Sequence, residues 1–130
     1  MLVCQLIIGI YNPFTALYPY KTIRDADSEI VNLANSTQGD VWLPMETYLY
    51  SRTNKEEWDN FCALFGPVWA GLPTPQRLLN ALDQRKFDMI LMRKNSTDLF
   101  RYFQPGVREL IKQGYHYKEK EGVVIYSKEK

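Results

Sequence analysis

Two carboxylates close together in the sequence are the first residues that could do chemistry. Asp25 and Asp27 form a D-x-D pair, the spacing with which some glycosyltransferases hold a divalent cation and a sugar nucleotide. Both carboxylates also suit the positively charged end of a helix, where Asp25 or Asp27 could cap the first turn. Because three-residue matches arise often by chance, the pair favours a helix start and predicts no metal site.

Other residue types used in catalysis are sparse. His116 is the only histidine, so a metal cluster or a Ser-His-Asp triad would depend on it. It lies in an alternating segment, which predicts a side chain facing solvent or a partner. The acidic residues are scattered and predict a solvated face: Glu46, Glu56, Glu57 and Asp59. The glycine-rich phosphate motif GxGxxG and the Walker lysine motif are absent, so the sequence predicts neither a catalytic residue nor a cofactor.

Two further motifs carry little functional information. Cys4 and Cys62 have no CxxC spacing and no neighbouring histidine, which argues against a disulfide framework or a zinc site and leaves a single disulfide open. Asn35-Ser36-Thr37 and Asn95-Ser96-Thr97 match the glycosylation sequon, which matters only in a host that glycosylates it.

The composition indicates one folded domain. The chain has 130 residues, of which 45% are hydrophobic and 24% charged, values typical of a globular protein. The net charge of +1 provides no electrostatic attraction for nucleic acid. Nine tyrosines contribute to an aromatic share of 14%. Tyrosine suits interfaces and membrane boundaries, or the edge of an ordinary core.

The start of the chain is apolar. Residues 1–11 contain one polar side chain, Gln5, and no charge, but a bilayer crossing needs about 20 apolar residues. Asn12-Pro13 predicts a helix stop. Aromatic residues of the kind that settles at headgroup level surround it: Tyr11, Phe14, Tyr18 and Tyr20. The nearby basic residues are balanced by acidic ones, which favours the outer side of a membrane.

Two interpretations of this start remain open. Residues 1–12 form the trailing end of a transmembrane helix, with residues 13–130 as a soluble α/β domain, or residues 2–10 form a buried first strand. A secretory signal is disfavoured because the basic n-region and the small-residue cleavage site are missing.

The remaining sequence predicts alternating helices and strands. A helix should begin at Asp25 or Asp27, bury Ile30, Val31, Leu33 and Ala34, and end at Gly39. Thr74-Pro75 predicts a second helix start, with an end near Arg85-Lys86. The expected remainder comprises strands at 40–45 and 87–92, short helices at 45–50 and 56–65, a helix at 104–114, and a hairpin formed by 115–120 and 123–128.

This order predicts the fold class. The apolar run at 87–92 is typical of a strand covered on both faces, as in a parallel sheet. We therefore expect a three-layer, Rossmann-like α/β domain with a mostly parallel sheet and a C-terminal β-hairpin at one edge.

The fold class also predicts where a ligand would bind. In open α/β sheets, ligands occupy the crevice beyond the carboxyl ends of the strands. Those ends should present Met45 and Glu46 from one strand and Arg93, Lys94 and Asn95 from the next. These five residues are the ligand-crevice candidates.

Several of these features, taken in order, resemble one family. They are Tyr11-Asn12-Pro13, Pro19, Asp25-Ala26-Asp27, Gly39-Asp40, Leu78-Leu79, Arg85-Lys86-Phe87-Asp88, Gly114-Tyr115 and Val124-Ile125-Tyr126. The pattern resembles the C-terminal extracytoplasmic domain of bacterial multi-spanning glycosyltransferases of the GT-C class. These are related to dolichyl-phosphate-mannose protein mannosyltransferases and aminoarabinose transferases. The resemblance covers nearly the whole chain and rests on spacing, without a catalytic signature.

The resemblance implies an accessory role at the cell membrane. Such enzymes use a polyprenyl-phosphate-linked sugar, and their catalytic acids lie in the first extracytoplasmic loop, so no residue here inherits that role. The domain would be extracytoplasmic, with the transmembrane part of the same enzyme and the bilayer as partners. It would cap the active-site cavity or assist acceptor recognition. The alternative is a free-standing small α/β module that binds a ligand or a protein.

Overall fold

The computed structural model describes residues 13–59, 71, 73–97 and 105–128. The two interpretations of residues 1–12 lie outside this part of the chain, as do Cys4 and Cys62. Within the described residues, no helix combines the length and the apolar character needed to span a bilayer.

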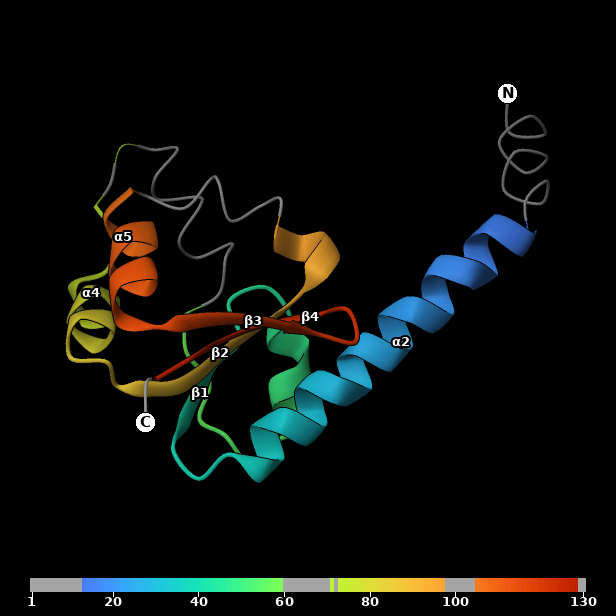
Figure 1. Cartoon of the computed structure of the whole chain (residues 1–130), viewed down its shortest axis with the longest axis horizontal. Helices are drawn as coiled ribbons and strands as arrows, with labels where there is room; N and C mark the ends of the chain where they lie inside the picture. The colour runs from blue at the N-terminus through green and yellow to red at the C-terminus, as the bar shows by residue number, and fades with distance from the viewer. Residues whose placement is uncertain (1–12, 60–70, 72, 98–104, 129–130) are drawn as a thin grey trace.

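The domain is built on a four-stranded mixed sheet with the order β1-β2-β4-β3 (Figure 1). β1 (Asp40–Trp42) pairs parallel with β2 (Phe87–Arg93), whose other side pairs antiparallel with β4 (Val123–Ser127). β3 (His116–Lys120) pairs antiparallel with β4 and forms the edge. The predicted C-terminal hairpin is therefore confirmed. One of the three pairings is parallel, so the prediction of a mostly parallel sheet is wrong.

The hairpin explains this difference. After β2, the chain passes through α5 (Pro105–Gly114) to the outer strand β3 and then turns back, which inserts β4 beside β2. Glu121 and Gly122 make the turn with φ of 50° and 77°, the left-handed conformation that two-residue hairpin turns require. A turn this tight reverses the chain, so β4 must run against β3, and it also runs against β2.

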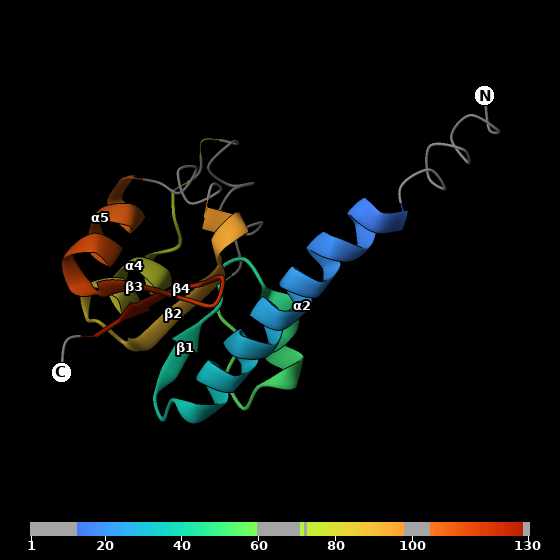
Figure 2. The same cartoon turned by 45° about the vertical axis from the view of Figure 1, so that its right-hand side comes forward.

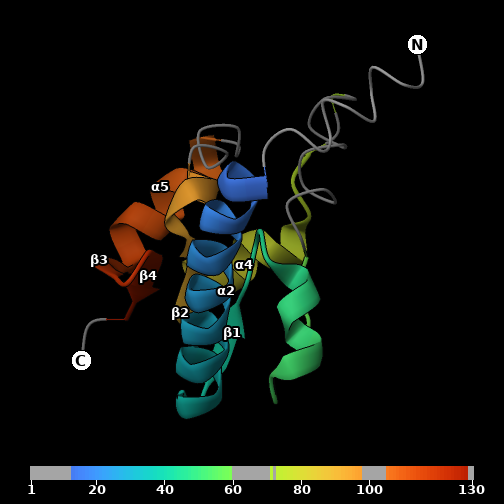
Figure 3. The same ribbon diagram turned by 90° about the vertical axis from the view of Figure 1, so that its right-hand side faces the viewer.

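Helices cover both faces of the sheet (Figures 1 and 3). α2 (Pro13–Ser36) and the 3-10 helix η1 (Thr47–Arg52) pack on one face. α4 (Gln76–Asp83) and α5 pack on the other. The strands serve both layers because successive side chains alternate between the faces. Ile90 and Met92 contact the α4–α5 layer, whereas Leu91 contacts the α2–η1 layer.

α2 differs from its predicted extent. It contains both Asp25 and Asp27, so neither residue caps its start. Pro13 is its first described residue. Only the C-terminal half contributes described side chains to the core, from Ala26 to Ala34, and the N-terminal half extends away from the sheet (Figures 1 and 2).

The end of α2 also differs from the prediction. The helix ends at Ser36, before Gly39. The hydroxyls of Ser36 and Thr37 both donate to the Leu33 carbonyl, at 3.0 and 2.7 Å. Gly39 has another role: a Cβ at this position would lie 2.1 Å from Oδ2 of Asp88. A larger residue here would therefore have to displace the Asp88 carboxylate.

Most of the remaining elements follow the prediction. α4, β2, α5 and the hairpin lie within a few residues of the expected ranges. The strand predicted at 40–45 is shorter and ends at Trp42, and the short helix that follows is η1. Residues 56–59 are not helical, which contradicts the start of the predicted helix at 56–65, and the rest of that range is not described.

Candidate functional site

The carboxyl ends of β1 and β2 bring two charged residues together. The chain leaves β1 at Trp42 and reaches Glu46 just before η1, while β2 ends at Arg93. Because the two strands are parallel, both ends lie at the same side of the sheet. The Nε atom of Arg93 donates to Oε1 of Glu46 at 3.0 Å. Two of the residues predicted at the carboxyl ends of the strands, Glu46 and Arg93, are therefore in direct contact.

Glu46 is fully buried at this position. Its Oε1 atom accepts a second hydrogen bond, from the Ser96 hydroxyl at 2.5 Å. Its Oε2 atom has no hydrogen-bond partner among the described residues. Burial raises the pKa of Glu46 above 4.5, although the bonds from Ser96 and Arg93 oppose this effect. Glu46 thus positions the Arg93 side chain through this hydrogen bond, although burial disfavours the negative charge of Glu46.

α2 supplies a second carboxylate to the same arginine. Oδ1 of Asp27 lies 3.8 Å from Nε of Arg93, and Oδ2 accepts a hydrogen bond from the Tyr48 hydroxyl at 2.7 Å. Burial and this bond raise the pKa of Tyr48 to about 12. We call these residues the arginine cluster: Asp27, Glu46, Tyr48, Arg93 and Ser96. It joins α2, η1 and the end of β2 in one polar contact.

The D-x-D pair does not act as a unit in this arrangement. Asp27 is buried in the arginine cluster, whereas Asp25 is exposed. Residues two positions apart on a helix point in different directions, which explains the separation. In the described part of the chain, no group of three or more His, Cys, Asp or Glu side chains could hold a metal ion.

A crevice of about 580 Å³ lies beside the arginine cluster, a volume suited to a small ligand. Arg93 belongs to both the cluster and the crevice. The crevice lies between α2 and the turn of the hairpin, and its lining comprises Thr22, Ile23, Ala26, Arg93, Lys94, Asn95, Thr97 and Gly122.

The five ligand-crevice candidates divide between different environments. Arg93, Lys94 and Asn95 line the crevice, and Glu46 is buried behind Arg93. Met45 packs against the core beneath α4 and α5 instead. No signal in the sequence predicts Ser96 or Tyr48 at this position, or the α2 wall formed by Thr22 and Ile23. Only the packing of α2 across the strand ends brings these residues together.

The basic side chains of the crevice are already paired. Lys94 lies 2.7 Å from Glu119 on β3, and this exposed contact raises the pKa of Lys94. For Arg93, burial lowers the pKa, but the hydrogen bond and charge of Glu46 outweigh this effect and raise it. Among the described residues that line the crevice, both basic side chains therefore have an acidic partner.

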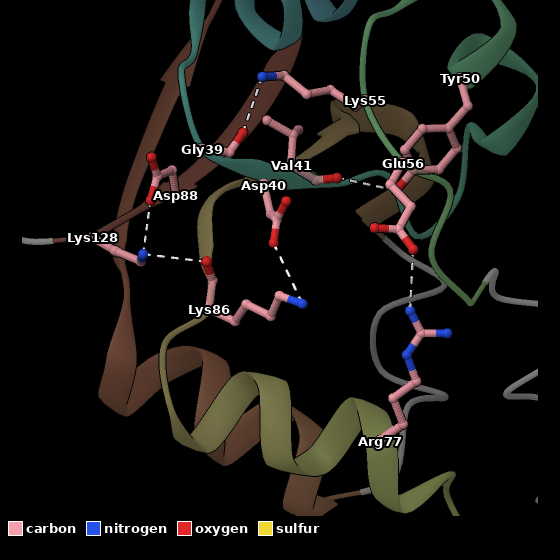
Figure 4. A network of polar contacts seen from close by, with 10 residues as sticks. All are labelled: Gly39, Asp40, Val41, Tyr50, Lys55, Glu56, Arg77, Lys86, Asp88 and Lys128. Carbon is pink, nitrogen blue, oxygen red and sulfur yellow. Dashed lines mark hydrogen bonds and ion pairs between the residues drawn. The ribbon is translucent and has the colours of Figure 1, made fainter.

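A different polar network lies at the opposite end of the sheet (Figure 4). Lys128 pairs with Asp88 at 2.7 Å, and Lys86 pairs with Asp40 at 3.6 Å. Lys55 donates to the Gly39 carbonyl at 3.0 Å and to the Thr37 carbonyl. These contacts tie the loop after α2 to the amino ends of β1 and β2, so we interpret the network as structural.

The remaining candidates lie away from the crevice. His116 is exposed on β3 and lines a hollow at the amino ends of the strands. Glu56 forms an exposed ion pair with Arg77 at 3.5 Å, Glu57 is exposed, and Asp59 is half-buried. Phe14, Tyr18 and Tyr20 belong to α2, but their side chains are not described, and Tyr11 lies outside the described residues.

The two sequons also differ in their surroundings. The Asn35 side chain accepts a hydrogen bond from the Asn54 N–H at 3.0 Å, at the end of α2. Asn95 is exposed at the crevice, in the short 3-10 turn formed by residues 94–97.

Comparison with known proteins adds no assignment: the chain matches no protein-family model, no curated protein and no solved structure.

Proposed function

We propose that this chain is an accessory extracytoplasmic domain of a polyprenyl-phosphate-sugar-dependent membrane glycosyltransferase, where it caps the active-site cavity or assists acceptor recognition. One observation carries the proposal. The crevice and the N-terminal half of α2 lie at the same end of the domain. A membrane helix preceding α2 would therefore place the crevice toward the membrane.

The direction of α2 follows from the chain path. A link of three residues, 37–39, joins the end of α2 to the start of β1, so the chain reverses between them. The N-terminal half of α2 consequently passes the carboxyl ends of β1 and β2, and Thr22 and Ile23 form a wall of the crevice. The arginine cluster holds α2 in this direction through Asp27.

The proposal assigns no catalytic step to this chain. The contacts of the arginine cluster fix its carboxylates in place. Glu46 is fully buried, so its carboxylate is not placed to exchange protons with a bound substrate.

We also propose that the fold is Rossmann-like. The parallel unit β1–α4–β2 supports this, since it has the strand–helix–strand order of such sheets.

Reading the genomic DNA upstream of Met1 tests the membrane assignment. The proposal expects an in-frame coding region of several hundred residues with many hydrophobic spans. In cells that express this whole reading frame, the protein should fractionate with membranes, and a cysteine introduced at the exposed position Asn32 should react with an impermeant reagent from outside. A promoter and ribosome-binding site immediately before Met1 would contradict the proposal.

The crevice also favours a second candidate, a free-standing α/β module that binds a ligand. Deletion of residues 1–12 distinguishes this candidate from the accessory domain. An accessory domain behind a membrane helix should remain folded, with the same free energy of unfolding. A free-standing module whose first strand is residues 2–10 should lose its cooperative unfolding transition.

A further inference from the structure

Within the described part of the chain, the Arg93 side chain has N–H donors that no acceptor uses, and it lines the crevice. Its Nε atom donates to Glu46 and faces Asp27. Among the described residues, no group accepts a hydrogen bond from its two Nη atoms. A guanidinium group carries five N–H donors, so the four on these atoms remain available. Glu46 and Asp27 act as positioning groups that fix the inner edge of the guanidinium.

Asn95 adds a second unused polar group. It is exposed, it lines the crevice, and its side-chain amide makes no hydrogen bond with another described residue. An amide offers both donors and an acceptor. The opposite wall includes Ile23 and Ala26 from α2, so the crevice combines polar groups on one side with apolar carbon on the other.

The charge balance disfavours an anionic ligand. The two cations at the crevice, Arg93 and Lys94, face three carboxylates, those of Asp27, Glu46 and Glu119. Two positive and three negative groups leave no positive excess, even if Glu46 is protonated. A phosphate bound to the Nη atoms would therefore meet no net positive charge and would lie near the carboxylates of Asp27 and Glu46. A neutral ligand with hydroxyl groups can use the free N–H donors at no such cost.

We propose that the crevice binds a neutral sugar ring, with hydroxyl oxygens accepting from the Nη atoms of Arg93, further hydroxyls bonded to Asn95, and the C–H face of the ring against Ile23. That the ligand is a sugar rests on the proposed function, whereas its neutral, hydroxyl-rich chemistry comes from the crevice itself. Either the acceptor or the sugar of the lipid-linked donor could supply such a ring.

Titrations of the ¹⁵N-labelled chain by NMR test this proposal. The probes are a panel of methyl glycosides of the common hexoses and pentoses, the corresponding glycosyl 1-phosphates, and inorganic phosphate. At least one methyl glycoside should give saturable shifts at the Asn95 and Gly122 amides and the Arg93 Nε–H, with a Kd in the millimolar range. A glycosyl phosphate that binds no more tightly than its methyl glycoside indicates recognition of the sugar alone.

Variants assign the binding to these side chains. Arg93→Gln should weaken binding about tenfold or more, as expected for loss of hydrogen bonds from a charged donor. This variant leaves Glu46 buried without its partner, so Asn95→Ala, which leaves the arginine cluster intact, serves as the second test and should also weaken binding. Arg77→Gln removes an arginine of α4, far from the crevice, and should change nothing.

Three results would overturn the proposal: no saturable shift with any neutral glycoside up to about 50 mM, saturable binding of inorganic phosphate alone, or binding that is unchanged in Asn95→Ala and Arg93→Gln. These outcomes are independent of the membrane assignment. A chain that binds glycosides without an upstream membrane region would refute the proposed function alone. A confirmed membrane region without glycoside binding would refute only this inference.

Discussion

At the scale of single residues, two positions depend on close contacts that the sequence does not reveal. Gly39 lies so near Asp88 that a Cβ has no room, because the Asp88 carboxylate is held by Lys128 at 2.7 Å. Glu46 is fully buried with one carboxylate oxygen that has no hydrogen bond in the described part of the chain. Both positions allow direct tests.

Gly39→Ala should lower the free energy of unfolding by about 1–3 kcal/mol, because the new methyl group must displace the Asp88 carboxylate from Lys128. The Asp88→Ala background removes the obstructing atoms, so there the same substitution should cost less than about 1 kcal/mol. Urea unfolding of the four proteins measures the difference. Equal costs in both backgrounds would show that the contact with Asp88 is not the cause.

Glu46→Gln should change the pH dependence of stability. Because burial raises the native pKa of Glu46 above 4.5, its contribution is fully present below that pH and is lost as the pH rises through the native pKa. The glutamine variant cannot titrate there. The free energy of unfolding of the wild type should therefore fall relative to the variant between pH 4.5 and neutrality.

Urea unfolding at a series of pH values measures this difference, and Glu57→Gln, which removes an exposed carboxylate, controls for the lost charge. If the wild type instead gained stability relative to Glu46→Gln as the pH rose, the ion pair with Arg93 would outweigh burial.

At the scale of elements, α2 has two parts with different roles. Its C-terminal half packs on the sheet through small and branched side chains, including Ala26, Ile30 and Ala34. The half nearer Pro13 passes the strand ends and provides a wall of the crevice. The packing of the C-terminal half on the sheet should therefore determine where the N-terminal half lies at the crevice.

Ile30→Ala should destabilise the domain by about 2–5 kcal/mol, because Ile30 is fully buried between α2 and the sheet and its loss leaves a cavity. Asn32→Ala, on the exposed face of the same helix, should change the free energy of unfolding by less than about 0.5 kcal/mol. Chemical unfolding followed by circular dichroism checks both values. Similar effects for the two variants would contradict the packing of α2 described above.

At the scale of the whole molecule, the two ends of the sheet differ in the polar contacts that they carry. The amino ends of β1 and β2 carry a network of lysine and aspartate contacts that ties loops together (Figure 4). The carboxyl ends carry the arginine cluster and the crevice. Between them, one buried tyrosine hydroxyl links η1 to β1 and the residue after it: Tyr50 accepts from the Leu43 N–H and donates to the Val41 carbonyl.

Alkaline pH should therefore lower the stability of the domain. Burial raises the pKa of both Tyr50 and Tyr115 to about 12, from 10.0. Their contribution to stability is present below pH 10 and is lost as the pH rises toward 12. Tyr50→Phe removes both buried hydrogen bonds of this hydroxyl, so at neutral pH it should cost about 1–3 kcal/mol.

Above pH 10 the wild type should lose part of this advantage, so its free energy of unfolding approaches that of Tyr50→Phe. Denaturant titrations at pH 9 and pH 11 measure the difference in free energy of unfolding between the wild type and Tyr50→Phe at each pH. If this difference were the same at both pH values, the Tyr50 hydroxyl would not resist ionisation in the native state.

Local signals in the sequence determined much of the fold. Pro75 marks the start of α4, the apolar run from Phe87 identifies β2, and Glu121-Gly122 identifies the hairpin turn. Each of these depends on backbone conformation or on periodicity within a few residues, which explains why the sequence is sufficient. The predicted end of this strand, together with the rule that ligands bind beyond the carboxyl ends of strands, also predicted that Arg93, Lys94 and Asn95 lie at one site.

Only the tertiary structure decided the rest. Local capping preference predicts a helix start at Asp25 or Asp27, but core packing of Ala26 and Ile30 places both aspartates inside α2. The position of β4 beside β2, which makes the sheet mixed, depends on pairing between distant segments. Helix geometry separates Asp25 from Asp27, and tertiary packing decides which partners Asp27 meets. Asp27 joins Arg93 and Glu46, which lie 47 residues apart, because long-range packing rather than sequence spacing brings their charges together.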